Sequence, residues 1–210
     1  MRGRLIAAVI LAALLWLFMF SPWTAGLTNF WLTMTASALI LSGLAWKFSP
    51  GSFPPVEKPL LQILAGILLA LLLWGIFWVG DKVSAQLFDF ARGKVDSIYA
   101  MKTGLPSSVI ALLLLLVIGP AEEFFWRGYV QRTLTLLFGE GRHPQDKAFL
   151  VTAIIYALVH VWSLNFMLIM AALVAGCFWG FLYRLCPKSL PALIVSHAVW
   201  DALVFVWMPI

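Results

Sequence analysis

The sequence predicts an all-α fold, a polytopic transmembrane helix bundle of about seven spans with one amphipathic interfacial helix. Of the 210 residues, 63% are hydrophobic and 11% are charged, whereas soluble domains average about 25% charged residues. Apolar runs of spanning length recur along the chain, with tryptophans near their ends as in an interfacial aromatic belt. This pattern indicates an integral membrane protein with lipid as a partner. We find no basic patch for nucleic acid.

The chain opens with two arginines followed by the apolar run Leu5–Phe20. Such a run is either a signal peptide or a first membrane span, and we favour a span because the apolar core is long and no clear cleavage pattern follows it. Trp31–Phe48 and Leu60–Val79 make the second and third spans, each bounded by Pro or Gly. Neither an internal repeat nor a soluble domain is visible.

The long polar segment Asp81–Gly104 carries apolar residues at spacings of three and four. That spacing predicts an amphipathic helix at the membrane interface, serving as a surface anchor or as a lid. It closes the N-terminal part, 1–106. The remaining part, 107–210, belongs to the same integral membrane domain and contains the spans 107–138, 148–162, 166–183 and 190–207. Small residues at 172, 176 and 180 predict close helix packing in the sixth span.

The basic residues fall unevenly on the two sides of these seven spans. Ten would lie on the side of the N-terminus: Arg2, Arg4, Lys47, Lys58, Arg127, Arg132, Arg142, Lys147, Arg184 and Lys188. Four would lie on the other side: Lys82, Arg92, Lys94 and Lys102. Because basic residues concentrate on the cytoplasmic side, we expect a cytoplasmic N-terminus, in the bacterial inner membrane.

Two adjacent carboxylates and an arginine interrupt the fourth span, in the stretch Gly119–Gly128. Each charge would cost about 2.5 to 3.5 kcal/mol at mid-bilayer, so an interface or a polar cavity is needed. Glu123 and Arg127 are four residues apart and lie on one helix face, which predicts an ion pair. Glu122 remains unpaired. Two acids in unequal environments are typical of acid–base catalysis, and the simpler alternative is a charged helix end at the membrane surface. Pro120 predicts a local break.

The later spans carry three more ionisable residues at depth, His160, His197 and Asp201. His197 and Asp201 are four residues apart, so a carboxylate can face the imidazole, and Ser196 adjoins them. Intramembrane ionisable residues mark functional sites, and we expect one common site. On straight helices His160 would lie ~20 Å from Lys147, and His197 would lie ~13 Å from Lys188. A tilted helix, or a helix that begins after Lys147, is needed to bring the two histidines to the same depth.

Three motifs occur in order: Glu122-Glu123-x-x-x-Arg127, Tyr156-x-x-x-His160 and His197-x-x-x-Asp201. Over residues 107 to 205 the chain resembles the CPBP family of intramembrane proteases, the CAAX-processing and bacteriocin-processing endopeptidases of glutamic type. Tyr156 stands where phenylalanine is more usual. The first 106 residues carry no motif, so the substrate class is not implied.

The resemblance implies hydrolysis of a peptide bond by an activated water, in a protein or peptide substrate at the membrane. Glu122, with His160 nearby, would act as the general base. His197 would donate to the oxyanion, with Asp201 holding its donor tautomer. Glu123 with Arg127 would orient Glu122. We expect a cytoplasm-facing cavity to admit water and an unwound substrate.

Other readings stay open. Zinc could be held by Glu122, His160 and His197, but with both histidines on the metal only Glu123 would remain as a base. We therefore prefer a mechanism without a cofactor. Cys177 and Cys186 show no metal or disulfide spacing. The same polar residues would also suit a noncatalytic scaffold or immunity factor, or a proton-coupled transporter.

Overall fold

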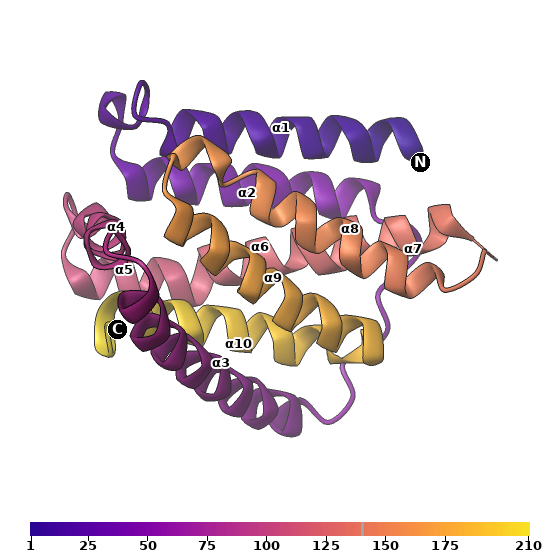
Figure 1. The fold of residues 1–210 in the computed structure, drawn as a ribbon. Coiled ribbons are helices and arrows are strands. Elements are labelled where there is room, and N and C mark those ends of the chain that lie inside the picture. Colours follow the sequence, from indigo (N-terminus) through magenta and orange to yellow (C-terminus); the bar gives the residue numbers. More distant parts are fainter. Residues whose placement is uncertain (140) are drawn as a thin grey trace.

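The computed structural model describes residues 1–139 and 141–210, and in these residues every regular element is helical. Helices α1, α2 and α10 run in nearly the same direction, α3 and α9 are inclined to them, and the short helix α4 lies at one end of the bundle (Figure 1). The helices are α1 Arg2–Phe20, α2 Phe30–Phe48, α3 Pro59–Leu87, α4 Ala91–Tyr99, α5 Ser107–Leu113, α6 Gly119–Glu123, α7 Arg132–Phe138, α8 Pro144–Leu158, α9 Phe166–Leu185 and α10 Leu190–Ala202.

Six helical stretches of the described chain are long and apolar enough to cross a membrane. They are Arg2–Phe20, Pro59–Leu87, Ser107–Phe138, Pro144–Ser163, Phe166–Leu185 and Pro187–Trp207. The predicted second span, α2, is not among the six, although its 19 residues match α1 in length. A helix of this length extends ~28 Å. The expected multi-pass helical bundle is confirmed, and the protein is an integral membrane protein.

The polar segment after the third span differs from its predicted form. Instead of one helix over 81–104, α3 continues to Leu87, and α4 covers only Ala91–Tyr99. The cause is an ion pair between the exposed Arg92 and the buried Asp81, in which Arg92 Nη1 donates to both carboxylate oxygens at 2.8 and 3.0 Å. This pair folds α4 back onto the end of α3, so the chain must turn between the two helices.

The fourth span is one continuous helix over Ser107–Phe138 that contains two π-helical segments. The first, Leu114–Ile118, ends two residues before Pro120, and its wider turn accommodates the missing proline N–H. The predicted break at Pro120 is therefore absent. At Gly119 an added Cβ would lie 2.6 Å from Cα of Ala198. This close approach to α10 brings Glu122 and Glu123 beside the helix that carries His197.

Helices α8 and α9 pack closely through the small-residue stripe of α9. A Cβ at Gly176 would lie 3.0 Å from Cδ1 of Tyr156, and one at Gly180 would lie 3.0 Å from Cδ2 of Phe149. The packing role predicted for this stripe is confirmed. It places Tyr156 deep between α8 and α9.

The two ends of the bundle differ in what they present. The N-terminus lies at the same end as the turn between α7 and α8, whereas α4 and residue 210 lie at the opposite end (Figure 1). Arg127 was counted among the ten basic residues of the N-terminal side. It is fully buried within the bundle, so nine of the ten remain as surface charges.

Candidate active site

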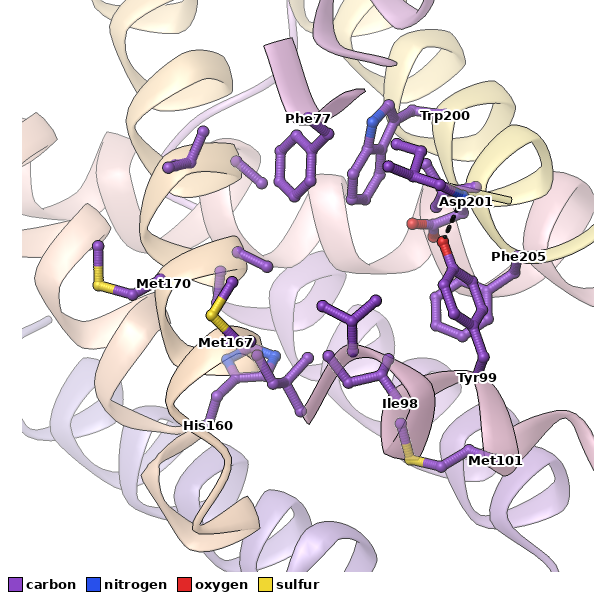
Figure 2. Close-up of a pocket in the computed structure, with 18 of the residues that line it drawn as sticks. Phe77, Ile98, Tyr99, Met101, His160, Met167, Met170, Trp200, Asp201 and Phe205 are labelled. Atoms are coloured by element: carbon purple, nitrogen blue, oxygen red, sulfur yellow. Dashed lines mark hydrogen bonds between the residues drawn. The ribbon is translucent and has the colours of Figure 1, made fainter. Parts of the chain in front are cut away.

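A cavity of about 480 Å³ lies inside the bundle, and all four residues predicted to be catalytic line it: Glu122, His160, His197 and Asp201. They come from α6, the turn after α8, and α10. Figure 2 shows His160 and Asp201 on different sides of this pocket. The structure thus brings the three motifs to one place, as the expectation of a common site requires. His160 and His197 line the same cavity, although their distances along the chain from the basic helix ends differ.

Most of the remaining lining is apolar. It includes Met101, Met167, Met170, Phe77 and Phe205, which are visible around the pocket in Figure 2. Apolar walls keep the local dielectric constant low and strengthen any charge interaction with a bound substrate. The methionines are flexible and adapt to different apolar shapes.

The cavity extends toward the end of the bundle that carries α4. Ile98, Tyr99 and Met101 line it there, and none of the described residues in the turns at the N-terminal end does so. A cytoplasm-facing cavity and a cytoplasmic N-terminus were both expected. The structure makes these two expectations incompatible, because the cavity extends toward the end opposite the N-terminus.

Glu123 and Arg127 form the predicted ion pair, with Arg127 Nη1 donating to Oε2 of Glu123 at 3.1 Å, both side chains being fully buried. The same oxygen lies 3.0 Å from Nδ1 of His197. The pair therefore holds His197 from behind the cavity. Its expected role of orienting Glu122 has no direct contact to support it, since neither Glu123 nor Arg127 hydrogen-bonds to Glu122.

Arg127 and Gln131 also tie this helix to α9. Arg127 Nη2 donates to the carbonyl oxygen of Gly176 at 3.2 Å, and Gln131 Nε2 donates to that of Gly180 at 2.8 Å. The glycines leave room for both long side chains to reach the α9 backbone. Both terminal nitrogens of Arg127 are therefore engaged, so its guanidinium is not free to pair with Glu122.

Trp179 covers the outer face of His197, with the rings stacked at 3.9 Å between centroids and 18° between planes. Its indole Nε1 donates to Oγ of Ser196 at 3.1 Å. Ser196, which adjoins His197 in the sequence, therefore faces Trp179 and does not line the cavity. No motif in the sequence indicated Trp179, whose position depends on how α9 meets α10.

Asp201 faces the other nitrogen of His197, with Oδ2 3.6 Å from Nε2. We expected Asp201 to hold the tautomer that donates from the opposite nitrogen. The structure gives that holding role to Glu123, which faces Nδ1 at 3.0 Å. When the carboxylate accepts a hydrogen bond from Nδ1–H, the neutral imidazole has its lone pair on Nε2.

Glu122 accepts a hydrogen bond from the Tyr156 hydroxyl, with 3.1 Å between Oη and Oε2. No arginine pairs with it, as the sequence predicted. Tyr156 was recognised only as an aromatic residue one turn before His160, and the direction of its hydroxyl could not be read from spacing.

Both ring nitrogens of His160 are occupied. The Trp16 indole, a donor only, lies 3.1 Å from Nε2, and the carbonyl of Tyr156, an acceptor only, lies 2.7 Å from Nδ1. These partners assign a neutral imidazole with its proton on Nδ1. Trp16 belongs to α1, in the part of the chain that carries no motif, and 144 positions separate it from His160.

The proposed zinc ligands do not form a metal site in this arrangement. Over residues 1–139 and 141–210 no group of three or more His, Cys, Asp or Glu side chains is placed to hold a metal ion. A metal at Glu122, His160 and His197 would need the Nε2 lone pair of His160, which the Trp16 indole occupies. These residues therefore do not fit zinc without rearrangement.

The fold and the site together define a polytopic membrane protein with a buried acid–imidazole cluster beside an apolar cavity. Residues 104–203 match the family model described as "Type II CAAX prenyl endopeptidase Rce1-like". This region covers all three motifs, and the match supports the predicted resemblance to the CPBP family of CAAX-processing membrane proteases. No curated protein and no solved structure matches the chain.

Proposed function

We propose that this protein is an intramembrane endopeptidase that hydrolyses a peptide bond of a membrane-associated or lipid-anchored protein by means of a water activated by Glu122. The observation that supports this most directly is that residues of all three motifs line one cavity. The peptidase activity of the family supports the reaction class. The mechanism uses no cofactor.

In the proposed reaction the water oxygen attacks the carbonyl carbon of the scissile bond while Glu122 accepts a water proton. The carbonyl oxygen becomes an oxyanion in the tetrahedral intermediate. That proton then passes from Glu122 to the amide nitrogen as the C–N bond breaks. One peptide bond and one water are thereby converted into a carboxyl group and an amine, and Glu122 returns to its starting state.

His197 is the proposed donor to the oxyanion. Because Nδ1–H of His197 donates to Glu123, a second donation from Nε2 requires the doubly protonated imidazolium. Two carboxylates, Glu123 and Asp201, flank the ring and stabilise that cation. Asp201 thus contributes as a counter-charge. His160 contributes to the shape and polarity of the cavity wall beside Glu122, since its nitrogens are engaged.

For the orientation, we propose a cytoplasmic N-terminus in the bacterial inner membrane. The cavity then extends toward the extracytoplasmic side, and substrates with an apolar chain and an unwound segment near that side are favoured. A proton-coupled transporter would need access from both sides of the membrane, whereas this cavity extends toward only one end of the described bundle.

The test is incubation of the purified protein with candidate membrane peptides, followed by mass spectrometry of the products. Glu122→Gln should remove cleavage, because the near-isosteric amide cannot accept a proton from water, and a loss of about 10²- to 10⁴-fold is expected for a general base. Glu57→Gln, at an exposed glutamate outside the cavity, is the control and should keep activity. Full activity of Glu122→Gln would overturn the mechanism, and intact peptides with the wild-type protein would favour the scaffold.

A further inference from the structure

Tyr156 connects two of the residues predicted to be catalytic. Its hydroxyl donates to Oε2 of Glu122 at 3.1 Å, and its backbone carbonyl accepts from Nδ1 of His160, 2.7 Å away. The two contacts use different parts of the residue, so its side chain can be changed without removing the carbonyl. Tyr156 itself lines the cavity.

The ring of Tyr156 is held from several sides. The Arg127 guanidinium lies 5.2 Å from the ring centroid, and Trp126 meets the ring edge to face, also at 5.2 Å. The backbone of Gly176 closes a third side, where even a methyl group would approach the ring to 3.0 Å. Because Tyr156 is only 5% exposed, its hydroxyl has little freedom to turn away from Glu122.

The consequence concerns the two oxygens of Glu122. Oε2 accepts from Tyr156, whereas Oε1 accepts no hydrogen bond from any residue that the structure describes. Oε1 of Glu123 is buried and has no hydrogen-bond partner. Neither oxygen of Glu122 is both buried and without a partner. Tyr156 therefore leaves one defined oxygen of Glu122 available to a water in the cavity.

We propose that Tyr156 is a positioning residue, whose hydroxyl fixes the Glu122 carboxylate so that Oε1 receives the water proton. This inference rests on the proposed function of Glu122 as the general base. The other explanation for the same bond is a purely structural link between α6 and α8. The two differ in what they affect, because positioning acts on the chemical step and a structural link acts on stability.

The test compares Tyr156→Phe with Tyr183→Phe. Both tyrosines are buried to a similar extent, 5% and 6% exposed, and Tyr183 does not line the cavity. Each variant loses one hydroxyl and keeps its ring. For Tyr156→Phe we expect kcat to fall about 10- to 100-fold, the effect of losing a hydrogen bond to a charged group, with KM within about twofold. The melting temperature should stay within about 2 °C of wild type.

Tyr183→Phe should leave kcat unchanged, and Tyr156→Phe added to Glu122→Gln should cause no further loss, because the two residues act as one unit. Unchanged kcat in Tyr156→Phe, or a loss that follows a lower melting temperature in both variants, would overturn the proposal.

A second readout does not depend on activity. The infrared difference between wild type and Glu122→Gln, recorded with isotope-labelled glutamate, isolates the carboxyl band of Glu122. In a Tyr156→Phe background this band should shift, because the carboxyl group loses a donor, and in a Tyr183→Phe background it should not. An unshifted band would overturn the positioning role even if no substrate is cleaved. A shifted band without cleavage would leave the positioning intact and count against the proposed function alone.

Discussion

Glu122 and Glu123 are neighbours in sequence but have opposite surroundings. Glu122 lines the cavity and meets one hydroxyl, whereas Glu123 is fully enclosed and shared between Arg127 and His197. An acid held by an arginine and an imidazole has a structural role, and an acid beside a cavity with one free oxygen is suited to proton transfer. The two positions should therefore respond differently to the same glutamate-to-glutamine change.

Glu123→Gln and Arg127→Ala should lower thermal stability as well as activity, because each leaves a desolvated partner without its counter-charge. Breaking a buried pair from one side costs about 3 to 5 kcal/mol. The measurement is the melting temperature in detergent, with Glu122→Gln as the comparison that stays folded. A Glu123→Gln protein as stable as wild type would contradict the role assigned to the pair.

Metal content provides a separate residue-scale prediction. Since the Trp16 indole occupies Nε2 of His160, the purified enzyme should contain well under one zinc per chain by elemental analysis. Its activity should survive dialysis against a strong chelator. Stoichiometric zinc, with activity lost on chelation and restored by the metal, would instead favour the ligand set Glu122, His160 and His197.

At the scale of elements, contacts between helices depend on a few close approaches. Helix α3 meets α10 at Gly66, where an added Cβ would lie 2.6 Å from both the carbonyl oxygen of Ala192 and Cβ of Val195. Backbone at this distance cannot move aside as a flexible side chain can. This contact positions α10, and with it His197.

Gly66→Ala should therefore destabilise the bundle by roughly 1 to 3 kcal/mol, the usual cost of overpacking. Gly75→Ala, in the same helix but with nothing within 4 Å of the added Cβ, is the matched control. It should be neutral or slightly stabilising, because alanine favours helix more than glycine does. Denaturant or thermal unfolding in detergent measures both, and equal stabilities would show that α3 and α10 can separate without cost.

Helix α4 covers the cavity end of the bundle and is held through polar contacts. Arg92 binds Asp81 on α3, and Nδ2 of Asn165 donates to the Lys94 carbonyl at 2.8 Å. Burial raises the pKa of the Tyr99 hydroxyl, which therefore stays neutral while it accepts the N–H of Ile210. These contacts fix α4 over the cavity end of the bundle.

Arg92→Gln should loosen α4, since it removes the closer of the two basic partners of Asp81 and leaves only Lys82, at 3.6 Å. Hydrogen–deuterium exchange of the α4 amides should accelerate by about tenfold or more, as expected when a local opening becomes easier by ~1.4 kcal/mol. Lys102→Gln, which removes a charge beyond α4 without touching Asp81, should leave exchange unchanged. Equal exchange rates in Arg92→Gln and wild type would show that the ion pair does not hold α4.

On the scale of the whole molecule, topology decides which compartment the cavity serves. The N-terminal end of the bundle carries nine surface basic residues and the α4 end carries four. Because basic residues concentrate on the cytoplasmic side, we expect α4 to lie outside the cytoplasm. In a background lacking Cys177 and Cys186, single cysteines near Lys94 should react with an impermeant thiol reagent in intact cells. Cysteines in the turn at Arg142 should be protected. The reverse pattern would invert the protein and turn the cavity toward the cytoplasm.

Sequence alone determined the helical class, the motif residues and the Glu123–Arg127 pair. These follow from hydrophobicity and from spacings of four, which are local and need no knowledge of other helices. It placed the boundary between the third span and the polar helix at Gly80, whereas α3 ends at Leu87, because that boundary depends on Arg92 reaching Asp81 across a turn.

Only the tertiary structure decided which groups surround the reactive residues. Trp16 lies 144 positions from His160, Glu123 lies 74 from His197, and Tyr156 lies 34 from Glu122. Such contacts depend on how helices far apart in the chain approach one another, and close approaches at backbone positions such as Gly119 and Gly66 set that arrangement. The direction of the cavity has the same origin, because a helix's periodicity shows which face is buried but not where its neighbours leave space.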